Sequence, residues 1–294
     1  MTPVREKTKK GGGRRHYLLP LLLLLLAIPV LVAVSGELRR ETGTIVGQNT
    51  VSVNDGVRTV SIVPLSDVPV SGLTAEDFRT DGDMVSYRGS ARQGIDVSEH
   101  QGQIDWEQVA GSGIAFVYLR LGYRGTTEGQ IHLDERFAEN LEGARAAGLD
   151  VGVYFFSQAL DQREANEEAD FVAQTLGGQK LDLPVMFDWE PVKREGSRTE
   201  GLEAQVVTTC AEAFCRRITL SGYGAGVYFN RQQGYYSYDL SQLKDFAFWV
   251  SDPNPWPDFY YRFDMWQYSF TGHVPGINTS VDRNLLFEKG GAEG

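Results

Sequence analysis

Short apolar runs alternate with helical patterns along residues 94–268, and this alternation limits the fold more than any other feature of the chain. The runs expected to form strands are Gly94–Val97, Ile114–Leu121, Val151–Phe156, Pro184–Glu190, Gly226–Phe229, Ala247–Val250 and Phe263–Tyr268. Apolar stripes at helical spacing lie between the early runs, at Phe137, Leu141 and Ala144 and at Ala165, Ala169, Val172 and Leu176. Buried strands alternating with helices favour a parallel sheet, and a sheet of this length indicates a closed α/β barrel.

The run Pro184–Glu190 ends in two carboxylates, Asp188 and Glu190, two positions apart. Side chains alternate between faces along a strand, so both acids project from the same side at its C-terminal end. Repulsion between close acids raises at least one pKa and leaves a protonated acid beside an ionised one. Glycoside hydrolysis requires this division of roles. An isolated pair more often ends a strand as solvated acids, so other segments decide between the two interpretations.

Three further motifs accompany this strand end. They are Gly94–Trp106, Met265–Ser269 and Val281–Asn284, which read GIDVSEHQGQIDW, MWQYS and VDRN. The four motifs in this order resemble the lysozymes of glycoside hydrolase family 25, which cleave peptidoglycan. The resemblance extends from about Gly94 to Phe287. It implies an irregular TIM-like (β/α) barrel whose last three strands lack proper helices, and hydrolysis of the β-1,4 bond between N-acetylmuramic acid and N-acetylglucosamine.

Active sites of such barrels lie at the C-terminal ends of the strands. Asp96, Asp188 and Glu190 fall at such ends, whereas Asp282 follows the last expected strand. The resemblance places the catalytic acids of the family at these four positions. We expect Glu190 to be the general acid, because it would lie deepest and next to Trp189, and both would raise its pKa. Asp188 would be a nucleophile or would orient the acetamido group of the substrate, and Asp96 and Asp282 would tune the pair.

A glycan cleft also needs aromatic rings and polar groups. The candidates for substrate binding are Tyr154, Tyr228, Trp249, Trp266, Gln267 and Tyr268. Tyr154 and Trp266 are preferred because they lie within motifs like those of the family. Asp105 is expected to cap a helix that starts near Ile104, and His100 to make a loop hydrogen bond. Two passages depart from the common family pattern, Leu119–Tyr123 and Tyr154–Gln158, and they affect subsite contacts more than the reaction.

Two rival functions belong to other classes. The first is a chitinase-like N-acetylhexosaminidase, which also uses an Asp-x-Glu strand end on a barrel. Against it, the D-x-x-D-x-D-x-E pattern is incomplete, because Leu181–Pro184 precedes the strand in place of further acids at the needed spacing. The second is a non-catalytic protein that binds cell-wall glycan. Against this, the chain keeps all four acids, and a binding module has no reason to tolerate their mutual repulsion.

The charge distribution indicates a membrane-targeted protein with an acidic body. The net charge is −11, although residues 1–15 hold six basic side chains and only one acid. An acidic body argues against nucleic acid as a partner, because phosphate binding requires a basic face. The uncharged run Tyr17–Ser35 would span about 28 Å as a helix, close to the bilayer thickness. We favour a single-pass anchor with residues 1–16 as a basic cytoplasmic tail, and a cleaved signal peptide is the alternative. In either case the bulk of the chain lies outside the cell.

The remaining segments complete the predicted organisation. Residues 36–92 form a linker or small β-hairpin segment, residues 93–288 the hydrolase barrel, and residues 289–294 a disordered tail. Within the linker, the strands would be Thr44–Val53 and Val57–Val63, joined by a turn at Asn54–Gly56, and Thr74–Ala91 could equally be a disordered spacer. Cys210 and Cys215 lie on one expected helix, Glu200–Ser221, too far apart to pair. The histidines show no metal-ligand spacing, so we expect neither metal nor cofactor, and a monomer is the expected state.

Overall fold

Eight strands close into a barrel in the computed structural model, which describes residues 49–288. The strands are β5 (Ala91–Val97), β6 (Phe116–Arg124), β8 (Asp150–Ser157), β9 (Val185–Trp189), β10 (Ala225–Asn230), β11 (Ala247–Ser251), β12 (Met265–Gly272) and β13 (Val281–Phe287). Seven of them run parallel in the order β5, β6, β8, β9, β10, β11 and β12. The last strand, β13, is antiparallel to both β12 and β5 and closes the barrel. The short strand β7 (Ile131–Leu133) extends the edge of β6.

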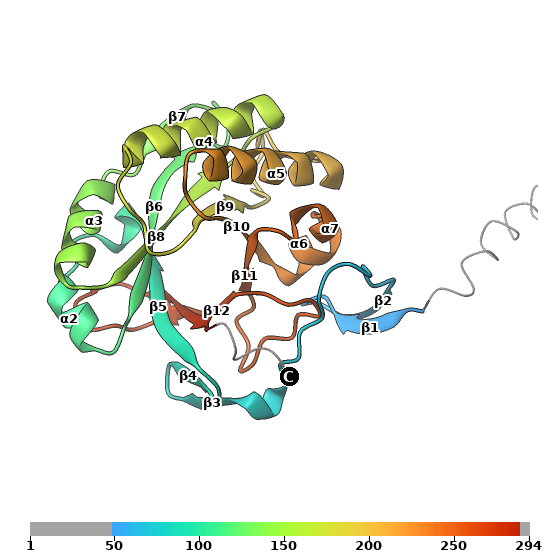
Figure 1. The fold of residues 1–294 in the computed structure, drawn as a ribbon, viewed down its shortest axis with the longest axis horizontal. Helices are drawn as coiled ribbons and strands as arrows, with labels where there is room; N and C mark the ends of the chain where they lie inside the picture. Colours follow the sequence, from blue (N-terminus) through green and yellow to red (C-terminus); the bar gives the residue numbers. More distant parts are fainter. Residues whose placement is uncertain (1–48, 289–294) are drawn as a thin grey trace, which may run out of the picture. The chain divides into compact units, whose positions relative to one another are not determined.

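Helices cover the outside of the first half of the barrel (Figure 1). They are α2 (Trp106–Gly111), α3 (Phe137–Ala146), α4 (Gln162–Leu176) and α5 (Ala204–Leu220), followed after β10 by the short α6 (Arg231–Tyr236) and α7 (Leu240–Leu243). Within residues 49–288, no helix follows β11 or β12. The seven predicted strands and the two predicted helical stripes are confirmed, with bounds shifted by a few residues. Asp105 caps α2 as predicted, since its carboxylate accepts a hydrogen bond from the Gln108 amide at 3.1 Å.

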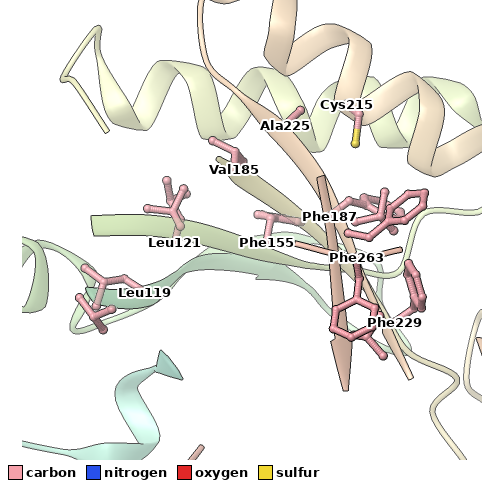
Figure 2. Packing of buried hydrophobic residues seen from close by; sticks show 14 of the residues in the cluster. Leu119, Leu121, Phe155, Val185, Phe187, Cys215, Ala225, Phe229 and Phe263 are labelled. Atoms are coloured by element: carbon pink, nitrogen blue, oxygen red, sulfur yellow. The ribbon is translucent and has the colours of Figure 1, made fainter. Parts of the chain in front are cut away.

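Alternating side chains divide the core into two layers. The outer layer packs strands against helices, and Figure 2 shows Phe155, Val185 and Phe187 there together with Cys215 of α5. The inner layer fills the barrel with Phe116, Tyr118, Met186, Tyr228, Trp249 and Met265. Cys210 and Cys215 are buried and unpaired, which confirms that prediction. Burial also raises the pKa of both thiols, so each acts as a small apolar side chain.

One prediction about the end of the barrel is wrong. Asp282 was expected to follow the last strand, but it lies on β13 and pairs directly opposite Asp96 of β5. Polar residues interrupt the apolar pattern of Val281–Phe287, which hides the strand in the sequence. Polar groups that face into the barrel are tolerated on β13 because this strand borders a pocket at the end of the barrel.

The segment before the barrel is ordered as two hairpins. The first joins β1 (Val51–Asn54) to β2 (Thr59–Ile62) through the predicted turn, in which Asp55 Oδ1 accepts amide hydrogen bonds from Val57 and Arg58. The second joins β3 (Phe78–Asp81) to β4 (Met84–Tyr87). The structure therefore favours the β-rich alternative for this segment and corrects the disordered spacer suggested for residues 74–91.

The second hairpin packs against strands that have no covering helix. The ring of Phe78 lies 5.3 Å from that of Trp266 on β12 and 6.3 Å from that of Phe287 on β13, measured between centroids. Tyr87 makes a similar edge contact with Phe287 at 5.2 Å. The β3–β4 hairpin thus covers apolar surface that helices cover elsewhere in the barrel.

The predicted membrane anchor belongs to residues 1–48, which precede the described part of the chain. The run Tyr17–Ser35, the basic tail 1–16 and the C-terminal residues 289–294 lie outside the described residues, as does the start of the strand predicted from Thr44. None of the helices within residues 49–288 is long and apolar enough to cross a bilayer.

If the β3–β4 hairpin belongs to the barrel core, Phe78→Ala will destabilise the whole protein. Truncating a buried Phe costs about 3–5 kcal/mol, from lost burial and the cavity left behind. The control is Arg79→Ala on the exposed side of β3, which should change stability by less than about 0.5 kcal/mol. Urea unfolding followed by fluorescence measures both values. Equal stability of the two variants would show that the hairpin is peripheral.

Candidate active site

A pocket of about 250 Å³ opens at the C-terminal ends of the barrel strands. Eight of the ten predicted site residues line it: Asp96, Tyr154, Asp188, Glu190, Tyr228, Trp249, Gln267 and Asp282. These residues come from β5, β8, β10, β11, β12 and β13, and from β9 and the position directly after it. The barrel thus brings together acids that are far apart in the sequence.

Asp188 and Glu190 project into the pocket from the end of β9, as the alternation of side chains requires. Asp188 is buried, and its Oδ1 has no hydrogen-bond partner among the described residues. Glu190 follows the last residue of the strand and is only half-buried. The prediction that Glu190 lies deepest is therefore wrong. Trp189 points to the opposite side, into the outer apolar layer, so it does not form the wall beside Glu190.

Burial and the charges of neighbouring acids raise the pKa of both acids at the end of β9. For Asp188, loss of solvation has the largest effect, followed by the nearby charges of Glu190 and Asp96, and the pKa rises well above its usual value. For Glu190, burial again acts first and the charge of Asp96 second. Carboxyl groups in such surroundings retain protons at a pH where exposed carboxyls have lost them.

Gln267 of β12 connects the other two acids. Its Nε2 donates hydrogen bonds to Asp96 Oδ2 at 2.9 Å and to Asp282 Oδ2 at 3.2 Å, while its Oε1 accepts one from the Tyr228 hydroxyl at 2.7 Å. Asn284 also donates to Asp96 Oδ2, at 2.8 Å. Burial raises the pKa of Asp96 to about 6 despite these hydrogen bonds, and burial together with the charge of Asp96 raises that of Asp282 to about 8. The amides hold two carboxyls side by side.

Aromatic rings form one wall of the pocket. The ring of Trp249 lies 4.9 Å from that of Tyr228 and 6.3 Å from that of Tyr154, both in edge-to-face arrangements. Trp249 is almost fully buried, and its Nε1 donates to Asn284 Oδ1 at 2.9 Å. Tyr154 is only half-buried. It is therefore the aromatic residue of this group best placed to contact a sugar.

Two predicted substrate-binding residues lie outside the pocket. Trp266 is fully buried in the outer layer, where its Nε1 donates to the Asp252 carbonyl at 2.7 Å. Tyr268 lies on the same side of β12, and its hydroxyl donates to Gln93 Oε1 at 2.7 Å. Side chains alternate along β12, so Gln267 faces the pocket whereas its neighbours Trp266 and Tyr268 face the outer layer. This alternation explains why the two predicted residues lie outside the pocket. Both aromatics are core residues.

Arg120 lines the pocket, although the sequence did not identify it as a site residue. Its Nε donates to Asp134 Oδ2 at 2.9 Å, its Nη2 lies 3.0 Å from Glu99 Oε1, and its guanidinium covers the ring of Tyr123. The positive charge of Arg120 opposes the rise in the pKa of Asp188. The feature of the sequence that could have identified Arg120 is its position near the end of β6, on the side of the strand that faces into the barrel. His100 also borders the pocket, whereas the sequence predicted only a loop hydrogen bond for it.

The chemistry of the pocket is that of an acid cluster. Among the described residues, no group of three or more His, Cys, Asp or Glu side chains is arranged to hold a metal ion. Four carboxyls with raised pKa values, beside one arginine and several aromatic rings, can donate and accept protons at a sugar bound in the pocket.

Comparisons with known proteins agree with this arrangement. The sequence model of "Glycosyl hydrolases family 25" matches residues 95–277. Lysozyme M1 of Streptomyces globisporus is 32% identical over 209 residues, which are 66% of this chain and 67% of that protein. The crystal structure of a bacterial lysozyme from Streptomyces coelicolor superposes with a TM-score of 0.54 at 27% identity, covering 68% of this chain and 94% of that one.

A more distant structure shares the fold. The modular autolysin LytC of Streptococcus pneumoniae, solved in complex with a synthetic peptidoglycan ligand, superposes with a TM-score of 0.59 at 24% identity. The superposition covers 67% of this chain and 47% of the autolysin, so the chain spans about half the length of that protein. The family match covers more than half of the chain and includes the strand ends that carry Asp96, Asp188 and Glu190. The chain therefore belongs to glycosyl hydrolase family 25, and it is an enzyme that hydrolyses glycosidic bonds.

Proposed function

We propose that this enzyme is a muramidase that hydrolyses the β-1,4 bond between N-acetylmuramic acid and N-acetylglucosamine in peptidoglycan. The observation that carries the proposal is the cluster of four carboxyls around one pocket at the catalytic end of the barrel. The relationship to lysozymes supports the substrate class. The half-buried Tyr154 provides an aromatic surface for the sugar.

Glu190 acts as the general acid. It is the more exposed of the two acids at the end of β9, so its carboxyl can reach the glycosidic oxygen of a bound glycan. Burial and the charge of Asp96 raise the pKa of Glu190, so this carboxyl keeps its proton to a higher pH than an exposed glutamate does, as a general acid requires. The charge of Asp96 contributes to that rise, which gives Asp96 a role in tuning the acid rather than in bond cleavage.

Asp188 orients the acetamido group of the substrate, whose carbonyl oxygen attacks the anomeric carbon as the glycosidic bond breaks and Glu190 protonates the leaving oxygen. Water then opens the resulting oxazolinium ion, which completes the hydrolysis. The buried Oδ1 of Asp188 lacks a partner, and the acetamido N–H is a donor that would fill this position. The charge of Arg120 opposes the rise in the pKa of Asp188, and a hydrogen bond from the bound acetamido N–H would further favour the ionised carboxylate. Substrate assistance of this kind is an accepted variant of the two-carboxylate mechanism. A direct nucleophilic role for Asp188 is the alternative.

Glu190→Gln tests the general-acid assignment. The variant should lose about 10²–10⁴-fold in turnover of purified peptidoglycan, because the amide cannot supply the proton but keeps nearly the same volume. Glycan binding should change little. The matched control is Glu200→Gln at an exposed position, which should keep wild-type activity. Release of reducing ends measures turnover. A Glu190→Gln enzyme with more than a tenth of wild-type activity would mean that another residue is the acid.

The two roles of Asp188 are separated by the chemistry of the substrate. If Asp188 orients the acetamido group, de-acetylated glycan should be a poor substrate even for the wild-type enzyme. A fluorinated sugar should then leave no covalent adduct. Intact-protein mass spectrometry after incubation with that sugar gives the answer. An adduct on Asp188 would establish the nucleophilic mechanism and refute substrate assistance, while leaving the muramidase proposal in place.

The enzyme acts outside the cell and is held at the membrane by residues 17–35. Support comes from the uncharged apolar run and the six basic residues that precede it. Protease added to intact cells should digest the barrel and leave a short membrane-bound fragment. Recovery of a soluble protein that starts near Gly36 would instead indicate a cleaved signal peptide.

A further inference from the structure

Two buried side-chain amides contact the main chain where the acid-bearing strand ends. The residue pairing of β9 with β8 ends at Trp189, so Glu190 has no partner residue in that ladder. Gln158 Nε2 donates a hydrogen bond to the Glu190 carbonyl at 3.1 Å. Gln233 Nε2 donates to the Trp189 carbonyl at 2.5 Å. We call Gln158 and Gln233 the amide clamp.

Gln158 is fully buried, and its own amide is held at both ends. Its Nε2 also donates to the Ser157 carbonyl at 2.8 Å, and its Oε1 accepts a hydrogen bond from the Thr199 hydroxyl at 2.8 Å. Arg198 donates to the main-chain carbonyl of Gln158 at 3.1 Å. Gln158 therefore connects Glu190 to Thr199, across the loop that leads from β9 to α5.

Gln233 holds the other side of the strand end from α6. Its side chain and that of Asn230 exchange hydrogen bonds with each other's main-chain amides at 2.9 and 3.0 Å, which caps the start of α6 directly after β10. The clamp thus ties the end of β9 to the ends of its two neighbouring strands. Both amides are buried, so water cannot replace a hydrogen bond that breaks there. Breaking one of these hydrogen bonds is therefore costly.

We infer that Gln158 is a positioning residue for the general acid, fixing the main chain of Glu190 and thereby the reach of its carboxyl to the glycosidic oxygen. The inference rests on the proposed function. A general acid must come within about 2.6–3.2 Å of the atom that it protonates, and a displacement of 1 Å can cost about 10²-fold in rate. Glu190 lies beyond the strand and is half-buried, so the ladder does not set its position.

The amide of Gln158 supplies both a donor, for the Glu190 and Ser157 carbonyls, and an acceptor, for the Thr199 hydroxyl. A carboxylate at this position would face the Glu190 carbonyl without a donor and would add negative charge near four acids. Methionine has a similar shape but makes neither strong hydrogen bond. Gln158→Met therefore removes the clamp contact while keeping the volume of the side chain.

The test compares two substrates with the full-length enzyme. One is purified peptidoglycan, whose sugar leaving group needs protonation. The other is the disaccharide of N-acetylglucosamine and N-acetylmuramic acid bearing a dinitrophenyl leaving group, which departs without a general acid. Gln158→Met should lower kcat on peptidoglycan at least tenfold, with KM within about twofold, because misplacing the acid removes a transition-state contact. On the dinitrophenyl substrate kcat should fall by less than about threefold. The matched control is Gln174→Met on the exposed face of α4, which should behave as wild type on both substrates.

A second variant covers the case in which Gln158→Met does not fold. Thr199→Val leaves Gln158 in place but removes the hydroxyl that holds its Oε1, so it should give a smaller loss with the same dependence on leaving group. Equal loss on both substrates, or no loss in folded protein, would overturn the positioning role. Failure of the wild-type enzyme to cleave peptidoglycan, with the dinitrophenyl substrate still cleaved, would contradict the proposed substrate rather than the clamp.

Discussion

Closure of the barrel between β5 and β13 places Asp96 opposite Asp282, and the rest of the site depends on that pairing. The two carboxyls share the amide of Gln267, and β9 presents two more acids to the same pocket. Burying so many ionisable groups is unfavourable, and the pKa values rise because the charged forms lose solvent. The apolar layers on both sides of the barrel wall stabilise a fold that tolerates this arrangement. As a result, the carboxyls at the catalytic end of the barrel keep their protons to a higher pH than exposed carboxyls do.

The sequence predicted the parts of the fold that follow from simple periodicity. Alternation placed Asp188 and Glu190 on one side of β9, and helical stripes identified the buried faces of α3 and α4. It could not tell which face of β12 points inward, because a shift of one residue reverses every side chain. Trp266 was therefore taken for a sugar-binding residue although it is a core residue. The depth of Glu190 was also misjudged, since burial depends on the loop that follows the strand.

The hairpin β3–β4 shows how segments outside the family match can support the catalytic barrel. The match begins at residue 95, yet Phe78 packs on Trp266 and so backs the strand that carries Gln267. The contact depends on residues far apart in the chain, and no local pattern predicts it. In the same way, the hydrogen bond from Gln158 to the Glu190 carbonyl joins the ends of β8 and β9, which their parallel pairing brings together. Packing on the outside and hydrogen bonding at the strand ends both contribute to the geometry of the pocket.

The identity of the new chain end released from purified peptidoglycan tests the muramidase activity most directly. Digestion with the wild-type enzyme, followed by reduction and mass spectrometry, shows which sugar carries the new reducing end. Muramidase activity predicts N-acetylmuramic acid at that end. A reducing end on N-acetylglucosamine, or binding of the glycan without any release, would contradict it.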